Sequence, residues 1–310
     1  MARLDLRALP HGRFGEGCPQ DNSLLKKLMV TFEMIKIEHT LFALPFAFLG
    51  ALFAANGLPS PSQAGWILLA MVGARSAAMA FNRLVDLPFD ARNPRTAGRA
   101  LPRGEVSRGY VAIFVFASSS IFVFAAAMLN PLALRLSPAA LAIILLYSFL
   151  KRFTWATHFF LGLSLACAPV GAWVAIRGSI SGVPLILGLA VVLWVAGFDI
   201  IYSCQDVAFD QSEPLHSVPK RFGIPCALWI SGALHACMVI MLSLLFVEMK
   251  LGIWSLAGLG LVTLLLAYEH SLVRPSDMSR VNAAFFTING WISVLLFVST
   301  GMDIIWHRVP

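Results

Sequence analysis

Residues 184–210 read PLILGLAVVLWVAGFDIIYSCQDVAFD, and this stretch decides the fold class. It begins with an apolar segment, 184–204, of about the 20 residues that a helix needs to cross the hydrocarbon of a bilayer. The chain then continues into Asp206 and Asp210. Carboxylates are costly in hydrocarbon, so in a membrane protein they usually mark a site for an ion or a substrate. The stretch therefore predicts a membrane helix that ends at a polar site.

The composition extends this prediction to the whole chain. Of its 310 residues, 58% are hydrophobic and 13% are charged, and the mean hydropathy is +0.79. A soluble domain carries about a quarter charged residues. We expect an all-α, polytopic membrane protein with nine spanning segments, near 38–56, 64–84, 109–129, 137–151, 155–176, 184–204, 224–247, 251–271 and 282–305.

The positions of Lys and Arg predict the orientation. If the N-terminus is cytoplasmic, most of the 23 basic residues lie on the cytoplasmic side, as basic residues of membrane proteins generally do. This explains the net charge of +7 without a nucleic-acid partner. Residues 1–30 contain no apolar segment, so they predict a basic tail and not a signal peptide.

Two aspartate pairs, Asp86/Asp90 and Asp206/Asp210, occupy matching places after long apolar segments. Asp206 follows Asp86 by the same number of residues as Asp210 follows Asp90. This equal offset is compatible with a duplicated four-helix unit at about 31–151 and 152–271, followed by a last helix. We expect a single domain at 31–310. Both pairs are predicted to lie at the cytoplasmic ends of their helices, where they can converge at one mouth of a helical bundle.

The first pair belongs to a polar stripe. Residues four apart share one face of a helix, so Asn82, Asp86 and Asp90 line up. Pro88 lies between the two aspartates, and it removes a backbone donor and restricts the residue before it. We therefore expect the helix to end or kink between Asp86 and Asp90.

The second pair extends a longer stripe. Steps of three and four place Asp199, Tyr202, Asp206 and Asp210 on one helical face, and nothing in this run breaks a helix before Pro214. Asp199 lies deeper in the membrane than the pair. Together with Arg75, it is an intramembrane charge, for which a functional role is the default.

These residue types predict a metal site for a phosphorylated substrate. Mg²⁺ in proteins is usually held by one or two carboxylates together with substrate phosphates. Two facing pairs could hold Mg²⁺ around a diphosphate and so favour its departure. Basic side chains on the same predicted side would complete the clamp: Lys151, Arg152, Arg95, Arg99, Lys220 and Arg221. The histidines at 158, 216, 235 and 270 form no metal set.

Three motifs resemble those of the UbiA family of intramembrane prenyltransferases, in the family's order and over nearly the whole chain from about residue 30. The first signature is Asn82-Arg-x-x-Asp86-x-x-x-Asp90, continuing as Ala91-Arg-Asn93-Pro94-Arg95-Thr96. The second is Tyr202-x-x-x-Asp206-x-x-x-Asp210, and the middle motif is Tyr147-x-x-x-Lys151-Arg152-x-Thr154.

This resemblance implies nine transmembrane helices around a central cavity in a bacterial cytoplasmic membrane. It implies Mg²⁺-dependent transfer of a polyprenyl chain from its diphosphate to an aromatic hydroxy acid of the 4-hydroxybenzoate type, in respiratory quinone biosynthesis. By the same resemblance, the Mg²⁺–diphosphate is bound by Asn82, Asp86, Asp90, Asp206 and Asp210. Lys151 and Lys36 contact the diphosphate, and Asp199 and Arg152 lie near the aromatic substrate.

The reaction expected from these residues is electrophilic aromatic alkylation. Lys151 stabilises the leaving diphosphate, and Asp199 assists the phenol or takes the ring proton. Tyr202 is assigned to the catalytic group with them, and Arg83 to the substrate-binding group.

The first helix departs from the family pattern. Many 4-hydroxybenzoate enzymes carry Arg-x-Asp-Lys-Pro there, whereas this chain has Lys36-Ile-Glu38-His39-Thr40. This run looks more like a branch in which some members are tied to menaquinone made from a dihydroxynaphthoate. The acceptor therefore stays open between the two kinds of acid.

Two other classes of protein also carry clustered aspartates in a membrane. A cation-coupled transporter would place its ion site near the bilayer midplane, on broken helices. An alcohol phosphotransferase would gather its aspartates in one Gly-containing motif. Neither matches two separated pairs at helix ends.

Overall fold

The structure is a computed structural model that describes residues 30–31 and 40–308. The described chain is helical throughout, apart from loops and one isolated bridge between Arg274 and Asp277. The long helices are α2 (Thr40–Ala55), α3 (Pro61–Asp90), α4 (Arg108–Leu129), α5 (Pro131–Leu150), α6 (Thr157–Arg177), α7 (Gly182–Ser203), α10 (Ile224–Glu248), α11 (Ile253–Leu272) and α12 (Asn289–Arg308). The short elements are η2 (Cys204–Asp206), α8 (Val207–Ser212), α9 (Val218–Phe222) and η3 (Ala283–Ile288).

The predicted membrane architecture is confirmed. Within the described residues, eight helical spans are long and apolar enough to cross a bilayer, and α2 adds a shorter apolar helix. These nine correspond one to one with the predicted segments. The proposed basic tail and Lys36 lie outside the described residues.

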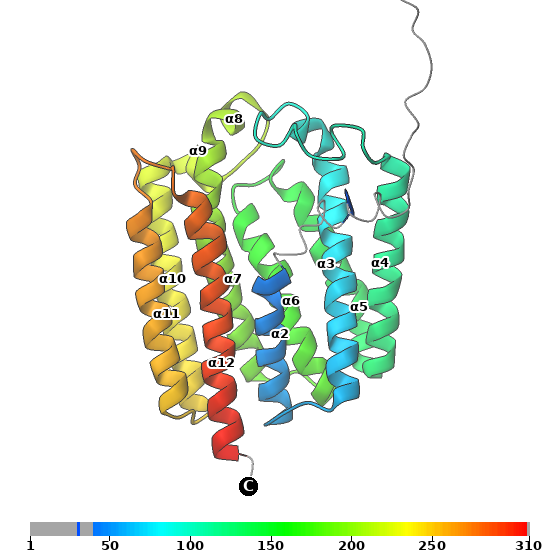
Figure 1. The fold of residues 1–310 in the computed structure, drawn as a ribbon, viewed down its shortest axis with the longest axis vertical. Coiled ribbons are helices and arrows are strands. Elements are labelled where there is room, and N and C mark those ends of the chain that lie inside the picture. The colour runs from blue at the N-terminus through cyan, green and yellow to red at the C-terminus, as the bar shows by residue number, and fades with distance from the viewer. Residues whose placement is uncertain (1–29, 32–39, 309–310) are drawn as a thin grey trace, which may run out of the picture.

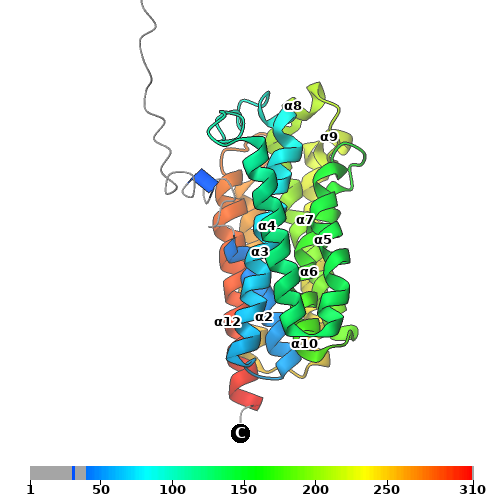
Figure 2. The same ribbon diagram turned by 90° about the vertical axis from the view of Figure 1, so that its right-hand side faces the viewer.

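The helices run up and down, roughly parallel to one long axis (Figures 1 and 2). Polar loops and the short helices α8 and α9 gather at one end of the bundle, with the C-terminal ends of α3 and α7. The C-terminus of the chain lies at the opposite end. Both aspartate motifs therefore reach the same end, which we call the polar end.

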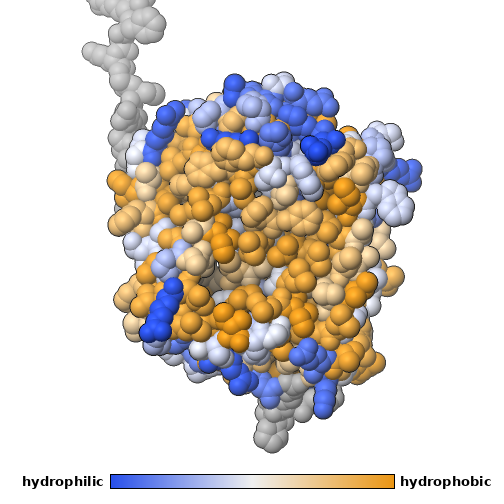
Figure 3. Space-filling view, turned by 180° about the vertical axis from the view of Figure 1, so that it is seen from behind, coloured by the Kyte–Doolittle hydropathy of each residue, from blue (hydrophilic) through white to orange (hydrophobic). Residues whose placement is uncertain are grey.

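The outer surface matches a lipid environment. On the face shown in Figure 3, apolar side chains form a broad belt across the middle, and hydrophilic residues gather mostly towards the two ends. Large apolar side chains on this surface are widely exposed, among them Phe116, Trp229 and Leu264. Exposure on this scale would be unfavourable in water, and lipid tails remove the cost. The belt is also hollowed on the face that Figure 3 shows.

Close helix contacts depend on small residues. A Cβ atom on Gly162 of α6 would lie 2.6 Å from the carbonyl oxygen of Val192 on α7. A Cβ atom on Gly50 of α2 would clash with the carbonyl oxygen of Pro169 on α6. Small residues of this kind let membrane helices pack backbone to backbone. As a result, α6 lies between α2 and α7 at short range.

The second half of the bundle is tied together by a buried polar chain. The indole of Trp194 on α7 donates to Asn289 Oδ1 at 2.7 Å, and Asn289 Nδ2 donates to Glu269 Oε1 on α11 at 2.8 Å. All three side chains are almost fully buried. Paired polar groups hold helices together where water is absent. These two hydrogen bonds connect α7, α11 and α12.

Two local expectations were wrong. Helix α3 continues through Pro88 and ends at Asp90, because a proline in the last turn costs few backbone bonds before the helix stops. The helix with the second motif is interrupted instead: α7 ends at Ser203 and a 3₁₀ turn, η2, precedes α8. The second motif is therefore divided over three helical elements, with Tyr202 in α7, Asp206 in η2 and Asp210 in α8.

Candidate active site

A cavity of about 1450 Å³ opens between the helices at the polar end. Its mouth is lined by residues of both aspartate motifs, and its deeper wall is mostly apolar, with Ile67, Leu129, Leu136 and Ile143 among the lining residues. Pockets for drug-sized ligands are about 300–1,000 Å³. The cavity therefore has room for a charged head at its mouth and a long apolar chain within.

Asp86 is held at the end of α3 by two neighbours. Lys151 Nζ, at the end of α5, lies 2.7 Å from Asp86 Oδ2, and Asn82 Nδ2 donates to the same oxygen at 3.1 Å. Asp86 Oδ1 is buried and has no hydrogen-bond partner within the described residues. An unsatisfied buried carboxylate oxygen is costly, so a cation is the natural partner for it.

Asp90 occupies the last position of the same helix. Arg99 Nη1 lies 2.7 Å from Asp90 Oδ2, and Arg83 Nη1 lies 4.0 Å from the same atom. Arg83 is itself buried within the bundle. Two guanidinium groups therefore surround the carboxylate beside the cavity mouth.

Asp206 brings the two motifs together. Asn93 Nδ2 donates to Asp206 Oδ1 at 3.2 Å, and Arg95 Nη2 lies 2.6 Å from Asp206 Oδ2. Arg95 Nη1 also donates to the hydroxyl of Tyr202 at 3.0 Å. Burial lowers the pKa of Arg95, but the hydrogen bonds and attraction from Asp206 and Tyr202 outweigh it, and the pKa lies above its usual value. Arg95 therefore remains cationic.

Asp210, in α8, is held by the following loop. Ser217 Oγ donates to Asp210 Oδ2 at 2.9 Å, and Lys220 Nζ donates to the backbone carbonyl oxygens of Asp210 and Glu213 at 2.6 and 2.9 Å. Ser217 is also the N-cap of α9, so the start of that short helix is tied to the carboxylate.

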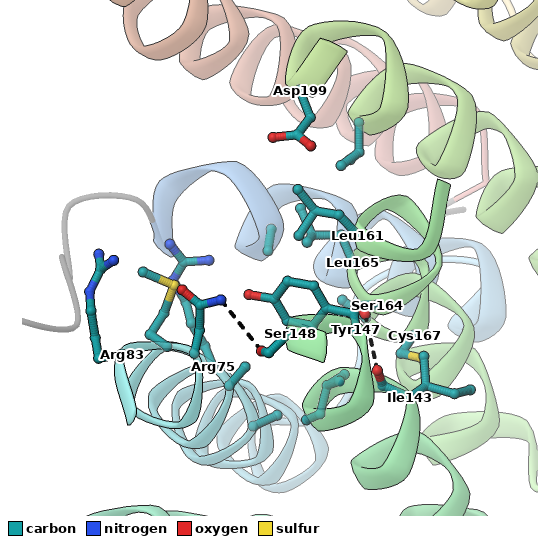
Figure 4. Close-up of a pocket in the computed structure, with 18 of the residues that line it drawn as sticks. Arg75, Arg83, Ile143, Tyr147, Ser148, Leu161, Ser164, Leu165, Cys167 and Asp199 are labelled. Atoms are coloured by element: carbon teal, nitrogen blue, oxygen red, sulfur yellow. Dashed lines mark hydrogen bonds between the residues drawn. The ribbon is translucent and has the colours of Figure 1, made fainter. Parts of the chain in front are cut away.

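Deeper in the cavity, a second polar group lies between α3, α5 and α7. Figure 4 shows Asp199 on one side of the cavity and Arg75 with Tyr147 on the other. Nε of Arg75 is buried without a hydrogen-bond partner, and no described acidic side chain pairs with this guanidinium. His158 Nδ1 lies 2.7 Å from Asp199 Oδ2.

A group of aromatic rings, which we call the aromatic wall, lines the same cavity. The rings of Tyr202 and Phe285 are 4.2 Å apart between centroids, and Phe285 contacts Phe198 and Phe286 at 5.1 and 4.6 Å. All four rings line the cavity. The face of an aromatic ring attracts cations. The wall is suited to a positively charged intermediate.

The carboxylates do not form a ready-made metal cage. In the described part of the chain, no three His, Cys, Asp or Glu side chains come together closely enough to hold one ion. One or two carboxylates per ion, with phosphate oxygens supplying the rest, is however the usual arrangement for Mg²⁺. The orphaned oxygen of Asp86 fits that arrangement.

Most predicted site residues come together at this cavity, and three of those that the structure describes do not. The cavity is lined by Asn82, Arg83, Asp86, Asp90, Arg95, Arg99, Lys151, Asp199, Tyr202, Asp206 and Asp210. Arg152 is instead packed over Phe89 and Phe149 and bonds the carbonyl oxygen of Val85. Lys220 faces backbone carbonyls. Arg221 lies over the ring of Phe222, and none of Arg152, Lys220 and Arg221 lines the cavity.

Sequence reasoning did not assign Asn93, Ser217 or His158 to the site. Asn93 lies within the first motif and could have been weighed there. Ser217 and His158 carry no motif signal, because their roles depend on loops and helices that meet only in the folded chain.

The chain was also compared with known proteins. The family model described as the UbiA prenyltransferase family matches residues 43–291. The chain belongs to the UbiA family. It is accordingly a polyprenyltransferase, and the transporter and phosphotransferase alternatives are not supported.

Relatives with names support the same assignment. The chain is 29% identical to a 4-hydroxybenzoate octaprenyltransferase of Alkalilimnicola ehrlichii, over 82% of this chain and 86% of that one. It is 32% identical to a 4-hydroxybenzoate octaprenyltransferase of Xanthomonas oryzae pv. oryzae, over 79% and 81%.

Solved structures share the UbiA fold. A UbiA homolog from Aeropyrum pernix K1 superposes with a TM-score of 0.79 at 36% identity, covering 87% of this chain and 99% of that one. A UbiA homolog from Archaeoglobus fulgidus, described as bound to GPP and Mg²⁺, superposes with a TM-score of 0.72 at 22% identity, over 89% and 99%.

Proposed function

We propose that this UbiA-family enzyme transfers a polyprenyl group from a polyprenyl diphosphate to an aromatic hydroxy acid of the 4-hydroxybenzoate type. One observation carries the proposal. Carboxylates of both motifs, interleaved with Lys151, Arg95 and Arg99, stand at the mouth of a large cavity with an apolar interior. This pattern suits a diphosphate joined to a hydrocarbon chain. The names of the bacterial relatives point to the same donor and acceptor classes.

The diphosphate head is assigned to the cavity mouth. Lys151, Arg83 and Arg99 lie beside the first carboxylate pair, where they can bind phosphate oxygens. Mg²⁺ held by Asp86, Asp90, Asp206 and Asp210, with Asn82 close by, would neutralise the leaving group. Lys36 is retained as a proposed diphosphate contact.

The aromatic acid is assigned to the deeper polar group. Arg75 and Asp199 face the same cavity from different helices (Figure 4). A guanidinium binds a carboxylate well, so Arg75 suits the acid group of the acceptor. Asp199 then suits the phenol at the other end of the ring.

The chemical step follows from this placement. The C–O bond of the allylic diphosphate breaks, and the diphosphate leaves with both electrons towards Lys151. The ring carbon next to the phenol carbon attacks the allylic cation beside Tyr202 and Phe285. Asp199 accepts the proton that the ring carbon loses, which restores aromaticity.

The prenyl tail and the membrane complete the proposal. The apolar interior of the cavity and the hollow in the apolar belt (Figure 3) suit a tail that reaches the lipid. Basic residues concentrate at the polar end, so we assign that end, and the N-terminus, to the cytoplasmic side of a bacterial inner membrane.

The test is product analysis with the purified protein in lipid vesicles. Mg²⁺ and a polyprenyl diphosphate are incubated with 4-hydroxybenzoate or with a dihydroxynaphthoate, and prenylated acids are identified by mass spectrometry. We expect prenylated 4-hydroxybenzoate, with chelation of Mg²⁺ abolishing it. Product from the naphthoate alone would transfer the proposal to menaquinone synthesis, for which the departure at Lys36–Thr40 leaves room. No product from either acid would refute the acceptor class.

A further inference from the structure

His158 is a deeply buried polar residue on the acceptor side of the cavity. It lies in the first turn of α6 and is 2% exposed. Both of its ring nitrogens have partners: Nδ1 lies 2.7 Å from Asp199 Oδ2, and Nε2 lies 3.2 Å from the backbone nitrogen of Val218. A buried ring with a hydrogen-bond partner at each nitrogen is held in one orientation.

These partners determine which nitrogen carries the proton. The backbone N–H of Val218 can only donate, so Nε2 of His158 must accept and cannot be protonated. The hydrogen of the neutral ring is therefore on Nδ1, and it is donated to Asp199.

The loop that contacts His158 also contacts the diphosphate end. The backbone N–H of His216 donates to the carbonyl oxygen of Lys151 at 2.6 Å. The hydroxyl of Ser217 donates to Asp210 at 2.9 Å. Three consecutive residues, 216–218, are thus bonded to Lys151, Asp210 and His158.

The partner of Asp199 differs in kind from those of three other cavity carboxylates. Asp86, Asp90 and Asp206 each face a Lys or Arg side chain. A nearby cation stabilises the charged form of a carboxylate and weakens it as a base. A neutral histidine orients Asp199 through a hydrogen bond and adds no positive charge beside it.

We propose that His158 is a positioning residue for the acceptor. Its ring holds the carboxylate of Asp199 towards the cavity. Through the bond from Val218 to His158, segment 216–218 fixes the position of that carboxylate relative to Lys151 and Asp210. His158 thereby sets the distance between the bound aromatic ring and the departing diphosphate. The proposal rests on the proposed function, because it concerns the acceptor half of the same site.

Three substitutions separate the two bonds of the ring. His158→Leu removes both. His158→Asn places an amide nitrogen near the position of Nδ1 and keeps the bond to Asp199. His158→Gln places its amide near the position of Nε2 and keeps only the bond to Val218. His270→Leu is the matched control, since His270 is another intramembrane histidine and does not line the cavity.

The measurement is steady-state kinetics of prenyl transfer in vesicles, with each substrate varied in turn, together with melting temperatures. In His158→Leu and His158→Gln we expect kcat/KM for the acceptor to fall at least about tenfold, with KM for the prenyl diphosphate within about twofold of wild type. His158→Asn keeps the bond to Asp199 but loses the link to Val218, so its loss should be smaller than that of His158→Leu and His158→Gln. His270→Leu should stay within about threefold of wild type for both substrates.

The outcomes distinguish the two proposals. Unchanged acceptor kinetics in His158→Leu would overturn the role of His158 while leaving the proposed function intact. Equal losses for both substrates, or an Asn variant as impaired as the Leu variant, would also overturn it. If the Leu variant does not fold, the contrast between Asn and Gln decides. A wild-type protein that prenylates no aromatic acid would refute the proposed function and this role with it.

Discussion

The guanidinium of Arg95 spans both carboxylate oxygens of Asp206, with Nε 3.0 Å from Oδ1 and Nη2 2.6 Å from Oδ2. The two residues are 111 positions apart and belong to different aspartate motifs. Their pairing joins the two aspartate motifs at the cavity mouth. A cation that binds Asp206 must share the carboxylate oxygens with Arg95 or displace Arg95. Cation binding at this carboxylate therefore affects the contact between the two aspartate motifs.

Replacing Arg95 by Lys should reduce prenyl transfer although the charge is kept. An ammonium is a point donor and cannot span two carboxylate oxygens in the manner of a guanidinium. We expect kcat/KM for the prenyl diphosphate to fall by about tenfold or more. Arg103→Lys is the control, because Arg103 pairs with Glu105 on an exposed loop, at 3.2 Å. Equal activity in both variants would show that the spanning contact is dispensable.

Asp86→Asn and Asp206→Asn should each abolish prenyl transfer without preventing membrane insertion. Each substitution removes the charge that a divalent cation needs and keeps the shape of the side chain. Asp277→Asn serves as the control, since Asp277 lies in an exposed loop, bonds to the nearby Ser279 and does not line the cavity. Product formation is measured at several Mg²⁺ concentrations. Full activity of either site variant would remove the metal-binding assignment.

Arg75→Leu should affect the acceptor and spare the donor. The buried guanidinium has no described acidic partner, so its loss leaves no buried charge unpaired inside the protein. If Arg75 binds the acid group of the acceptor, KM for the acid should rise by about tenfold or more, with KM for the prenyl diphosphate almost unchanged. In the wild-type protein, a phenol without the acid group should be a poorer acceptor than the hydroxy acid. In Arg75→Leu this difference between the two acceptors should disappear. A loss confined to the prenyl diphosphate would place Arg75 at the other half of the site.

Gly162→Ala should destabilise the protein. The added methyl group would lie 2.6 Å from the carbonyl oxygen of Val192, so α6 and α7 must move apart. We expect a loss of about 1–3 kcal/mol, the usual range for an overpacked contact. Gly260→Ala in α11 is the control, because its methyl group would meet nothing within 4 Å and alanine favours helix. Thermal unfolding in detergent measures both. A melting temperature unchanged in Gly162→Ala would contradict the close approach of these helices.

Much of the site was predictable from local spacing. Asn82, Asp86 and Asp90 share a helix face because the helical period is a property of the backbone, and the same period relates Asp199 to Tyr202. The break after Ser203 was not predictable in this way. No helix-breaking residue occurs there, and the 3₁₀ turn forms where the end of α7 meets the loop residues that bind Asp206 and Asp210.

The roles of Arg152 and Lys220 show the same limit. Their charges and positions resemble those of Lys151, yet one packs on two phenylalanine rings and the other bonds to carbonyl oxygens. A long, flexible side chain at a helix end can reach several partners, and which of them it meets depends on neighbouring elements.

By itself, the amino-acid sequence determined the membrane class, the nine apolar helices and the two carboxylate pairs, since hydropathy and helical period act over a few consecutive turns. Only the tertiary structure decided that Arg95 meets Asp206, that Arg75 and Asp199 face one cavity, and that His158 holds Asp199. The reason is physical: each of these relationships brings together segments that are far apart in the sequence, and their geometry depends on how closely small residues such as Gly162 allow the helices to pack.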